Sequence, residues 1–262
     1  MFALRLSLTS MYIRLLLILS SLLLSYQSWG QGTFYGLKGG LTIANQQWNA
    51  FDRDPLIAYH AILSAESAPA DDKFSLFAQL GYHLKGSAIR RSLFGNPFNA
   101  GFVSFPTQRF EFHNLSLSVG AKQVITQVGN SNVYYLFGIR GDYTLSTNLD
   151  EYERFSELNQ IPQGIYPLNV YFSENQILGV RRFNYGFLAG GGLNFPFSEY
   201  VEGIIEFTVN PDFSLQYQQP SIDNVRNPIN GQNTTIQERK IRNLTFELTV
   251  GARFLRKIEY ID

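Results

Sequence analysis

The residues best suited to acid–base or nucleophilic chemistry in this chain are three histidines and two serines. His60, His83 and His113 are the only histidines, and none lies at a metal-ligand spacing such as His-x-x-x-His. If the flanking segments are strands, their alternation places His60 and His83 on the inward faces of neighbouring strands. Ser116 and Ser118 then lie on the inward face of the next strand. A serine and a histidine within hydrogen-bond reach, with a carboxylate to orient the imidazole, would suit a lipase or acyltransferase.

Other signatures of catalysis or cofactor binding are weak. There is no Gly-x-Ser-x-Gly elbow, and the glycines at 190–192 lie inside an expected strand, whereas a nucleotide-binding loop opens a helix. The absence of cysteine excludes thiolate metal sites and cysteine nucleophiles. Polar side chains on an inward face most often hydrogen-bond one another. We therefore predict no catalytic, cofactor-binding or metal-binding residues, and keep a lipid-acting enzyme as the alternative.

The composition indicates a surface that is covered partly by something other than water. Charged residues make up 16% of the chain, against roughly 25% in an ordinary soluble domain, while aromatic residues reach 15%. Lys plus Arg and Asp plus Glu are equal at 21 each, so no net field would attract nucleic acid. We therefore expect a membrane lipid partner and no nucleic-acid partner.

The N-terminal segment predicts export. Arg5 and Arg14 precede an apolar run over residues 15–24, and small residues stand where a signal peptidase cuts, which predicts cleavage after Gly30. A membrane anchor helix is the alternative, but it needs about twenty apolar residues, and this run is shorter. Met11 is an equally good start, because a basic residue and the apolar run still follow it. The expected organisation is a signal peptide over residues 1–30 and one domain over residues 31–262.

The remaining chain alternates with the period of β-strands. In residues 244–254, for example, Leu248 and Val250 share one face, while Glu247 and Thr249 share the other. Eight such segments are apparent, and many approach the nine to eleven residues with which a tilted strand crosses a bilayer. The expected strands are residues 33–44, 56–66, 74–85, 115–121, 133–145, 183–195, 201–209 and 244–254.

The connections between these segments alternate in length. The second, fourth and sixth are short, at residues 67–73, 126–132 and 196–200. The third, fifth and seventh are long, at residues 86–108, 146–182 and 210–241, and only the first, residues 45–55, is intermediate. Outer-membrane barrels have short periplasmic turns and long extracellular loops, so this alternation predicts that all the long loops lie on one rim.

The residue types on the two faces of each segment predict the environment of each face, lumen or lipid. Glycines crowd the polar face, as expected where side chains from opposite walls share a narrow lumen. Charges of both signs on this face predict a paired network, because an unpaired charge there would be costly: Lys38, Lys85, Lys122, Arg140 and Arg253 with Asp142, Glu202, Glu206 and Glu247. Aromatic residues near the ends of the apolar face predict interfacial girdles: Tyr35, Tyr59, Tyr82, Tyr135, Tyr143, Phe183, Phe195 and Phe254. About eight strands leave a lumen filled by side chains, which argues against a general porin.

Three stretches carry a resemblance to a known family. They are Gly36-Leu37-Lys38-Gly39-Gly40-Leu41, the run from Phe74 to Tyr82 with Lys85-Gly86, and Ala189-Gly190-Gly191-Gly192-Leu193. The chain resembles the outer membrane protein β-barrel domain family, or PorT-like small outer-membrane barrels. It differs in having Gln79 where an acidic residue is frequent, and in continuing for eight residues after Phe254. The resemblance implies an exported barrel with a role accessory to protein secretion.

Together these patterns predict an all-β fold, a single antiparallel transmembrane β-barrel of about eight strands in the cell outer membrane. The predicted role is non-enzymatic, with a protein partner bound through the extracellular loops or the periplasmic rim. The alternatives are a lumen or rim enzyme acting on lipid, and a narrow barrel that binds or conducts a solute.

Overall fold

A computed structural model describes residues 32–48, 53–67, 73–89, 93–95, 102–104, 107–149, 180–226 and 231–257. The expected signal peptide and its cleavage point after Gly30 lie outside these residues. Among the described residues, no helix is both long and apolar enough to cross a membrane.

Eight long strands form one antiparallel sheet in the described part of the chain, in the order β1-β2-β3-β6-β7-β8-β9-β13. The first and last strands also pair with each other, from Gly32 opposite Lys257 to Trp48 opposite Ile241, which closes the sheet into a barrel. The strands are β1 Gly32–Trp48, β2 Asp54–Ser67, β3 Phe74–Ile89, β6 Gln108–Val128, β7 Ser131–Thr147, β8 Phe183–Pro196, β9 Val201–Pro211 and β13 Arg239–Lys257. Closure pairs the backbone groups of every wall strand, as a bilayer requires.

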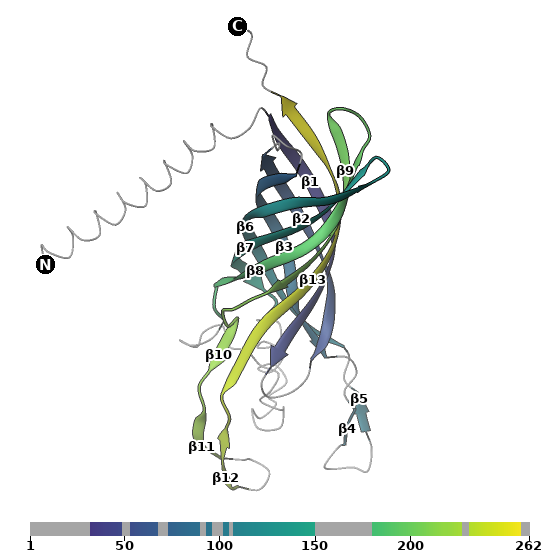
Figure 1. The fold of residues 1–262 in the computed structure, drawn as a ribbon. Helices are drawn as coiled ribbons and strands as arrows, with labels where there is room; N and C mark the ends of the chain where they lie inside the picture. The colour runs from purple at the N-terminus through teal and green to yellow at the C-terminus, as the bar shows by residue number, and fades with distance from the viewer. Residues whose placement is uncertain are drawn as a thin grey trace, which may run out of the picture.

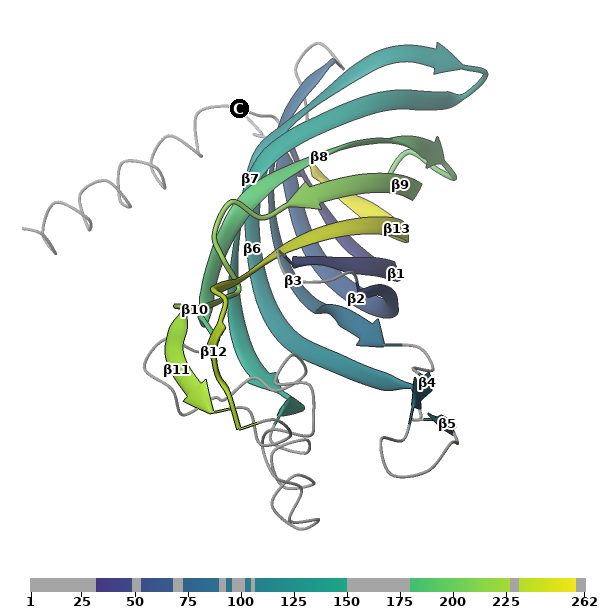
Figure 2. The same cartoon turned by 90° about the horizontal axis from the view of Figure 1, so that it is seen from below.

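The two ends of the barrel differ as the connection lengths predict (Figure 1). The β2–β3, β6–β7 and β8–β9 connections lie at one end, which we call the turn rim, and the chain enters β1 and leaves β13 there. The strand ends that lead into the longer connections lie at the opposite end, the loop rim, seen from below in Figure 2. Five short strands belong to these longer connections: β4 Leu93–Gly95, β5 Phe102–Ser104, β10 Tyr217–Gln219, β11 Ile222–Arg226 and β12 Asn233–Ile236.

All eight predicted segments are strands, and most are longer than predicted. The largest difference is β6, which has 21 residues where the pattern indicated residues 115–121. The alternation of polar and apolar residues fails at its first half because Phe110 and Phe112 face inward and are fully buried. The expected loop over residues 210–241 likewise contains β10, β11, β12 and the start of β13.

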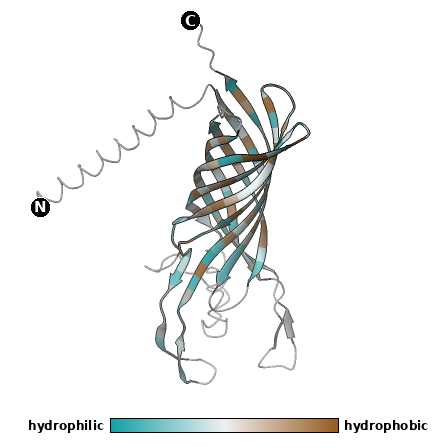
Figure 3. Cartoon of the chain, viewed as in Figure 1, coloured by the Kyte–Doolittle hydropathy of each residue, from teal (hydrophilic) through white to brown (hydrophobic). Residues whose placement is uncertain are grey.

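The outer face of the barrel is apolar around its circumference. Along the strands, hydrophobic and hydrophilic residues alternate (Figure 3). The exposed side chains include Leu37, Leu41, Ile57, Leu63, Leu80, Leu117, Val119, Phe137, Ile139, Ile205, Phe207, Leu248 and Val250. Of the predicted girdle residues, six are exposed, namely Tyr35, Tyr59, Tyr135, Tyr143, Phe183 and Phe254, while Tyr82 and Phe195 are half-buried. A surface of this kind is stable against hydrocarbon and not against water.

Inward-facing glycines let neighbouring strands approach closely at the lumen side. A Cβ on Gly40 would lie 1.9 Å from the carbonyl oxygen of Leu248, and one on Gly120 would lie 2.3 Å from that of Phe137. Crowding between opposite walls was the expected reason for these glycines. At these two positions the nearest atom instead belongs to the adjacent strand, so glycine is needed for the tight inward curvature of a small barrel.

The lipid-facing role of the exterior predicts a depth-dependent cost for a charge. Leu117, at the middle of β6, is 59% exposed, and Val128, at the strand's end, is 64% exposed. Leu117→Arg should lower the unfolding free energy in lipid bilayers by about 2–4 kcal/mol, and the control Val128→Arg by about 0–1 kcal/mol. Equilibrium denaturant unfolding in vesicles measures both. Equal effects of the two substitutions would contradict a membrane-spanning outer face.

Candidate functional site

The strands bring the charged and titratable side chains of the sequence into the lumen. The predicted inward cations Lys38, Lys85, Lys122, Arg140 and Arg253 are all buried there. Their side chains form ion pairs that join strands across the barrel and along its wall. The paired network that the alternation predicted is therefore confirmed, and it forms two clusters at different heights.

The loop-side cluster comprises Lys85, Arg140, Asp142, Asp212 and Glu247. Lys85 Nζ lies 2.6 Å from Asp142 Oδ2 and 3.3 Å from Asp212 Oδ1. Arg140 Nε donates to Asp142 Oδ1 at 2.9 Å, and its Nη1 donates to Glu247 Oε1 at 3.0 Å. The side chains of all five residues are about 2% exposed or less. Such pairs are strong only because every charge in the cluster has a partner.

The turn-side cluster comprises Lys38, Glu66, Lys122, Glu202, Glu206 and Arg253. Its carboxylates are bridged by cations, with Lys122 Nζ and Arg253 Nη1 on Glu66 at 3.1 Å and 2.7 Å. Arg253 Nη2 also donates to Glu202 at 2.6 Å, and Lys38 Nζ to Glu206 at 3.1 Å. The Tyr134 hydroxyl donates to Glu206 at 3.0 Å.

Two members of these clusters were absent from the predicted network. Glu66 is the last residue of an expected strand, where the alternation of polar and apolar residues no longer fixes whether a side chain points inward or outward. Asp212 falls in an expected loop, but it bridges to Gly186 of β8 and its side chain enters the lumen. Only the observed pairing of the segment after β9 reveals this placement, and no local sequence signal does.

The loop-rim mouth of the lumen is closed by the segment that follows β9. Gln216 Oε1 accepts hydrogen bonds from Asn243 at 2.9 Å and from Asn184 at 3.2 Å. An apolar cluster packs beside this polar layer, and its members are at most 2% exposed: Phe110, Phe112, Leu149, Tyr217 and Ile241. These described residues fill the mouth, which leaves little room for a solute path.

The histidines and serines do not assemble the nucleophilic pair that the alternative of a lipid-acting enzyme requires. Ser116 donates its hydroxyl to Asp142 and accepts a hydrogen bond from Arg140 Nη2 at 3.2 Å. His83 Nδ1 instead contacts Glu247 Oε1 at 2.8 Å. His113 Nδ1 is hydrogen-bonded to the Tyr82 hydroxyl, outside the two ion-paired clusters. The Ser116 hydroxyl is therefore held by an acid and a guanidinium, with no imidazole to act as its base.

The two inward histidines do meet each other, which the spacing along the chain does not indicate. His60 of β2 lies directly opposite His83 of β3, and the imidazole centroids are 5.4 Å apart with an interplanar angle of 13°. Strand register, and not sequence separation, produces this contact.

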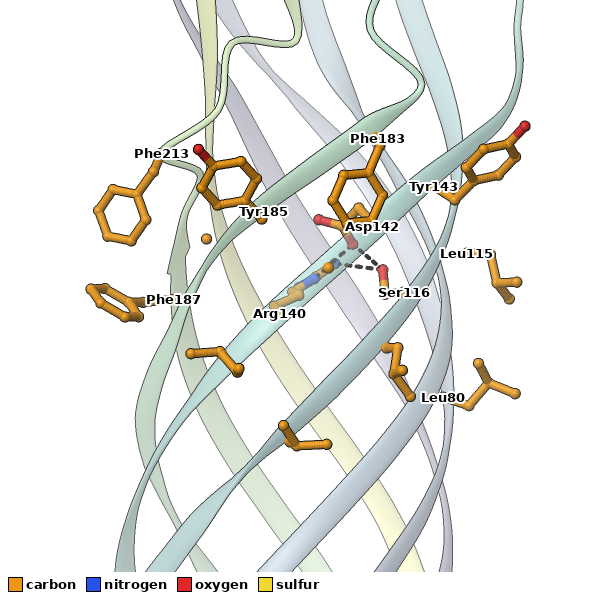
Figure 4. Close-up of a pocket in the computed structure, with 15 residues that line it drawn as sticks. Leu80, Leu115, Ser116, Arg140, Asp142, Tyr143, Phe183, Tyr185, Phe187 and Phe213 are labelled. Atoms are coloured by element: carbon orange, nitrogen blue, oxygen red, sulfur yellow. Dashed lines mark hydrogen bonds and ion pairs between the residues drawn. The ribbon is translucent and has the colours of Figure 1, made fainter. Parts of the chain in front are cut away.

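A groove of about 710 Å³ lies over β6, β7 and β8. It is lined by outward aromatic and aliphatic side chains, among them Tyr143, Phe183 and Phe187, while Arg140 and Asp142 lie behind the wall (Figure 4). Gly141 contributes no side chain to this part of the outer face. Because the groove is on the lipid-facing surface, it would lie against acyl chains of the membrane.

Comparison with known proteins finds similarity at the level of architecture. No protein-family model and no curated protein sequence matches the chain. Among solved structures, the N-terminal β-barrel domain of Pseudomonas aeruginosa OprF is 10% identical with a TM-score of 0.40, covering 87% of this chain and 99% of that one. Neisserial surface protein A is 10% identical with a TM-score of 0.43, covering 85% and 96%. The Escherichia coli outer membrane protease OmpT is 9% identical with a TM-score of 0.36, covering 86% and 97%.

The closed wall and its apolar exterior define the class of protein and its location. A sealed antiparallel barrel whose outward side chains are apolar is an outer-membrane β-barrel embedded in lipid.

The interdependence of the lumen charges predicts a large effect of removing one carboxylate. Asp142→Asn keeps the side chain's shape but leaves Lys85 and Arg140 with one fewer anion, so the unfolding free energy should fall by about 3–5 kcal/mol. The control is Glu238→Gln, which removes an exposed pair with Lys240 and should change stability little. Denaturant unfolding of the refolded barrels measures the difference. Similar small losses in both variants would show that the network contributes little.

Proposed function

We propose that this outer-membrane barrel is non-enzymatic and acts by binding a protein partner at its loop rim. The observation that carries the proposal is the contrast between a lumen closed by paired charges and a loop rim that extends well beyond the wall. The β11–β12 hairpin and the β4–β5 hairpin both project from that rim (Figure 1). In this orientation the loop rim is extracellular and the turn rim periplasmic, as is usual for such barrels.

The resemblance to PorT-like proteins supports a more specific version of this role. In that version the barrel is exported by a signal peptide over residues 1–30, and the mature domain over residues 31–262 is accessory to secretion of other proteins. A partner could then also be bound at the periplasmic turn rim. The resemblance is carried by residues of the barrel wall, such as Gly36–Leu41 and residues 189–193. These residues therefore support the type of barrel more strongly than they support any particular partner.

Among the described residues, the inward Ser116 has no imidazole partner, and this supports a non-enzymatic role over a lipid-acting enzyme. The Ser116 hydroxyl is engaged by Asp142 and Arg140. Purified barrel should therefore show no phospholipid hydrolysis or acyl transfer that depends on this serine. Turnover that disappears in Ser116→Ala or His83→Ala would contradict the proposal, as would stable single-channel steps in planar bilayers.

The role of the loop rim can be tested by removing its projecting hairpin. Because Gln219 lies opposite Arg239, residues 220–238 can be replaced by an Asn-Gly turn without disturbing the β10–β13 pairing. The variant should still fold, as judged by a heat-modifiable shift on electrophoresis, but should lose a partner recovered by cross-linking and pull-down from outer membranes.

The matched control alters the opposite rim. Replacement of Phe197–Tyr200, the β8–β9 turn, by a generic turn should leave partner recovery unchanged. Recovery that survives the hairpin deletion but is lost in this control would assign binding to the turn rim and overturn the loop-rim proposal.

A further inference from the structure

Three potential metal ligands from three strands converge in the middle of the lumen. They are His60 of β2, His83 of β3 and Glu247 of β13, and one ligand atom from each lies within 4.8 Å of the others. All three residues are at most 3% exposed. The set belongs to the loop-side cluster through Glu247, but the ion pairs described above do not require either imidazole.

The chemistry of this set suits a divalent transition metal. Two neutral imidazoles and one carboxylate are a common ligand set for zinc, with a fourth position left for water or another ligand. Imidazole ligands also accept copper, nickel and iron, whereas magnesium and calcium prefer oxygen ligands alone.

The charge balance of the lumen favours a cation at this height. The turn-side cluster contains three cations and three carboxylates: Lys38, Lys122 and Arg253 with Glu66, Glu202 and Glu206. The loop-side cluster contains two cations, Lys85 and Arg140, against three carboxylates, Asp142, Asp212 and Glu247. Every carboxylate in the loop-side cluster has a cationic partner, but with both imidazoles neutral its formal charges sum to −1, and excess buried charge is costly.

The surrounding hydrogen bonds resemble those that orient metal ligands. His60 contacts Thr42 Oγ1 through Nδ1 and Thr249 Oγ1 through Nε2, both at 2.9 Å. If one nitrogen binds metal, the other retains a hydroxyl partner that fixes the ring, as is typical of metal-bound histidine. Glu247 is likewise held by Arg140 Nη1 at 3.0 Å.

Binding requires the site to contract. A separation of up to 4.8 Å between ligand atoms is wider than tetrahedral coordination allows, since zinc–nitrogen bonds are about 2.0–2.1 Å long. The imidazoles must therefore turn from their present partners toward a common centre. Gly81 gives the His83 ring its space, because a Cβ there would lie 2.4 Å from His83 Nε2.

We propose that His60, His83 and Glu247 form a binding site for one divalent transition-metal ion, of which zinc is the probe, inside the barrel lumen. The ion links β13 to the β2–β3 pair on the lumen side of β1 and offsets the excess negative charge. Because the ligands are buried, the ion enters while the barrel folds and exchanges slowly afterwards.

The test is metal retention by the full-length mature barrel. Protein unfolded in denaturant with chelator is refolded into detergent micelles with or without zinc, passed over a chelating resin to remove surface metal, and analysed for zinc content. We expect about one zinc per folded chain when zinc is present during folding, and little when it is added only after folding. Zinc should also raise the unfolding midpoint of the barrel.

Variants then assign the ligands. His60→Gln and His83→Gln keep a hydrogen-bonding side chain but remove an imidazole, and each should lose the retained zinc. The matched control is His113→Gln, whose imidazole contacts Tyr82 outside the cluster and should leave retention intact. Cobalt substitution provides a second readout, because tetrahedral cobalt has a characteristic visible absorption that both lumen variants should abolish.

Two results would overturn the proposal. If the folded wild-type barrel retains no zinc after passage over the chelating resin, the site is excluded, and no variant is needed to show this. Equal zinc retention in wild type, His60→Gln and His83→Gln would place the metal elsewhere. Neither result bears on partner binding at the loop rim, so the proposed function stands or falls separately.

Discussion

The structure depends on one constraint, namely that the two faces of each strand lie in different environments and must each carry side chains that suit one of them. Outward side chains meet hydrocarbon, which offers no hydrogen bonds, and inward side chains meet a narrow lumen packed with other side chains. Backbone polar groups are satisfied only because β1 pairs with β13 and closes the wall. The polar inward face must then be satisfied from within, and the ion pairs centred on Asp142 and Glu66 do this.

This constraint also explains where function is expected. In the described part of the chain, the lumen charges are paired and Gln216, Tyr217 and Ile241 are buried at the mouth. The sequence can vary at the rims without destabilising the barrel wall, because the connections there leave the bilayer. The proposed partner binding at a rim and the proposed ion binding inside the lumen therefore depend on different parts of the scaffold.

The sequence predicts the wall well and the lumen only in part. The outward face of strands such as β8 and β13 is apolar along most of its length, so strand number, facing and the sorting of loops follow directly, although the inward face also carries apolar side chains such as Leu188 and Ile241. Phe110 and Phe112 are apolar although they face inward, because they belong to the apolar cluster at the loop-rim mouth. No local sequence pattern indicates that cluster. Asp212 and the His60–His83 contact depend on which residues lie opposite each other across strands, information that spacing along the chain does not contain.

The most direct test of the account is the environment of alternate residues along one strand. The chain contains no cysteine, so single cysteines at Leu248, Val250, Thr245 and Thr249 of β13 can carry spin labels in bilayers. Labels at 248 and 250 should collide readily with oxygen dissolved in lipid, while labels at 245 and 249 should be shielded from oxygen and from a water-soluble nickel complex. Labels at 248 and 250 that react mainly with the water-soluble complex would contradict a hydrocarbon-facing wall.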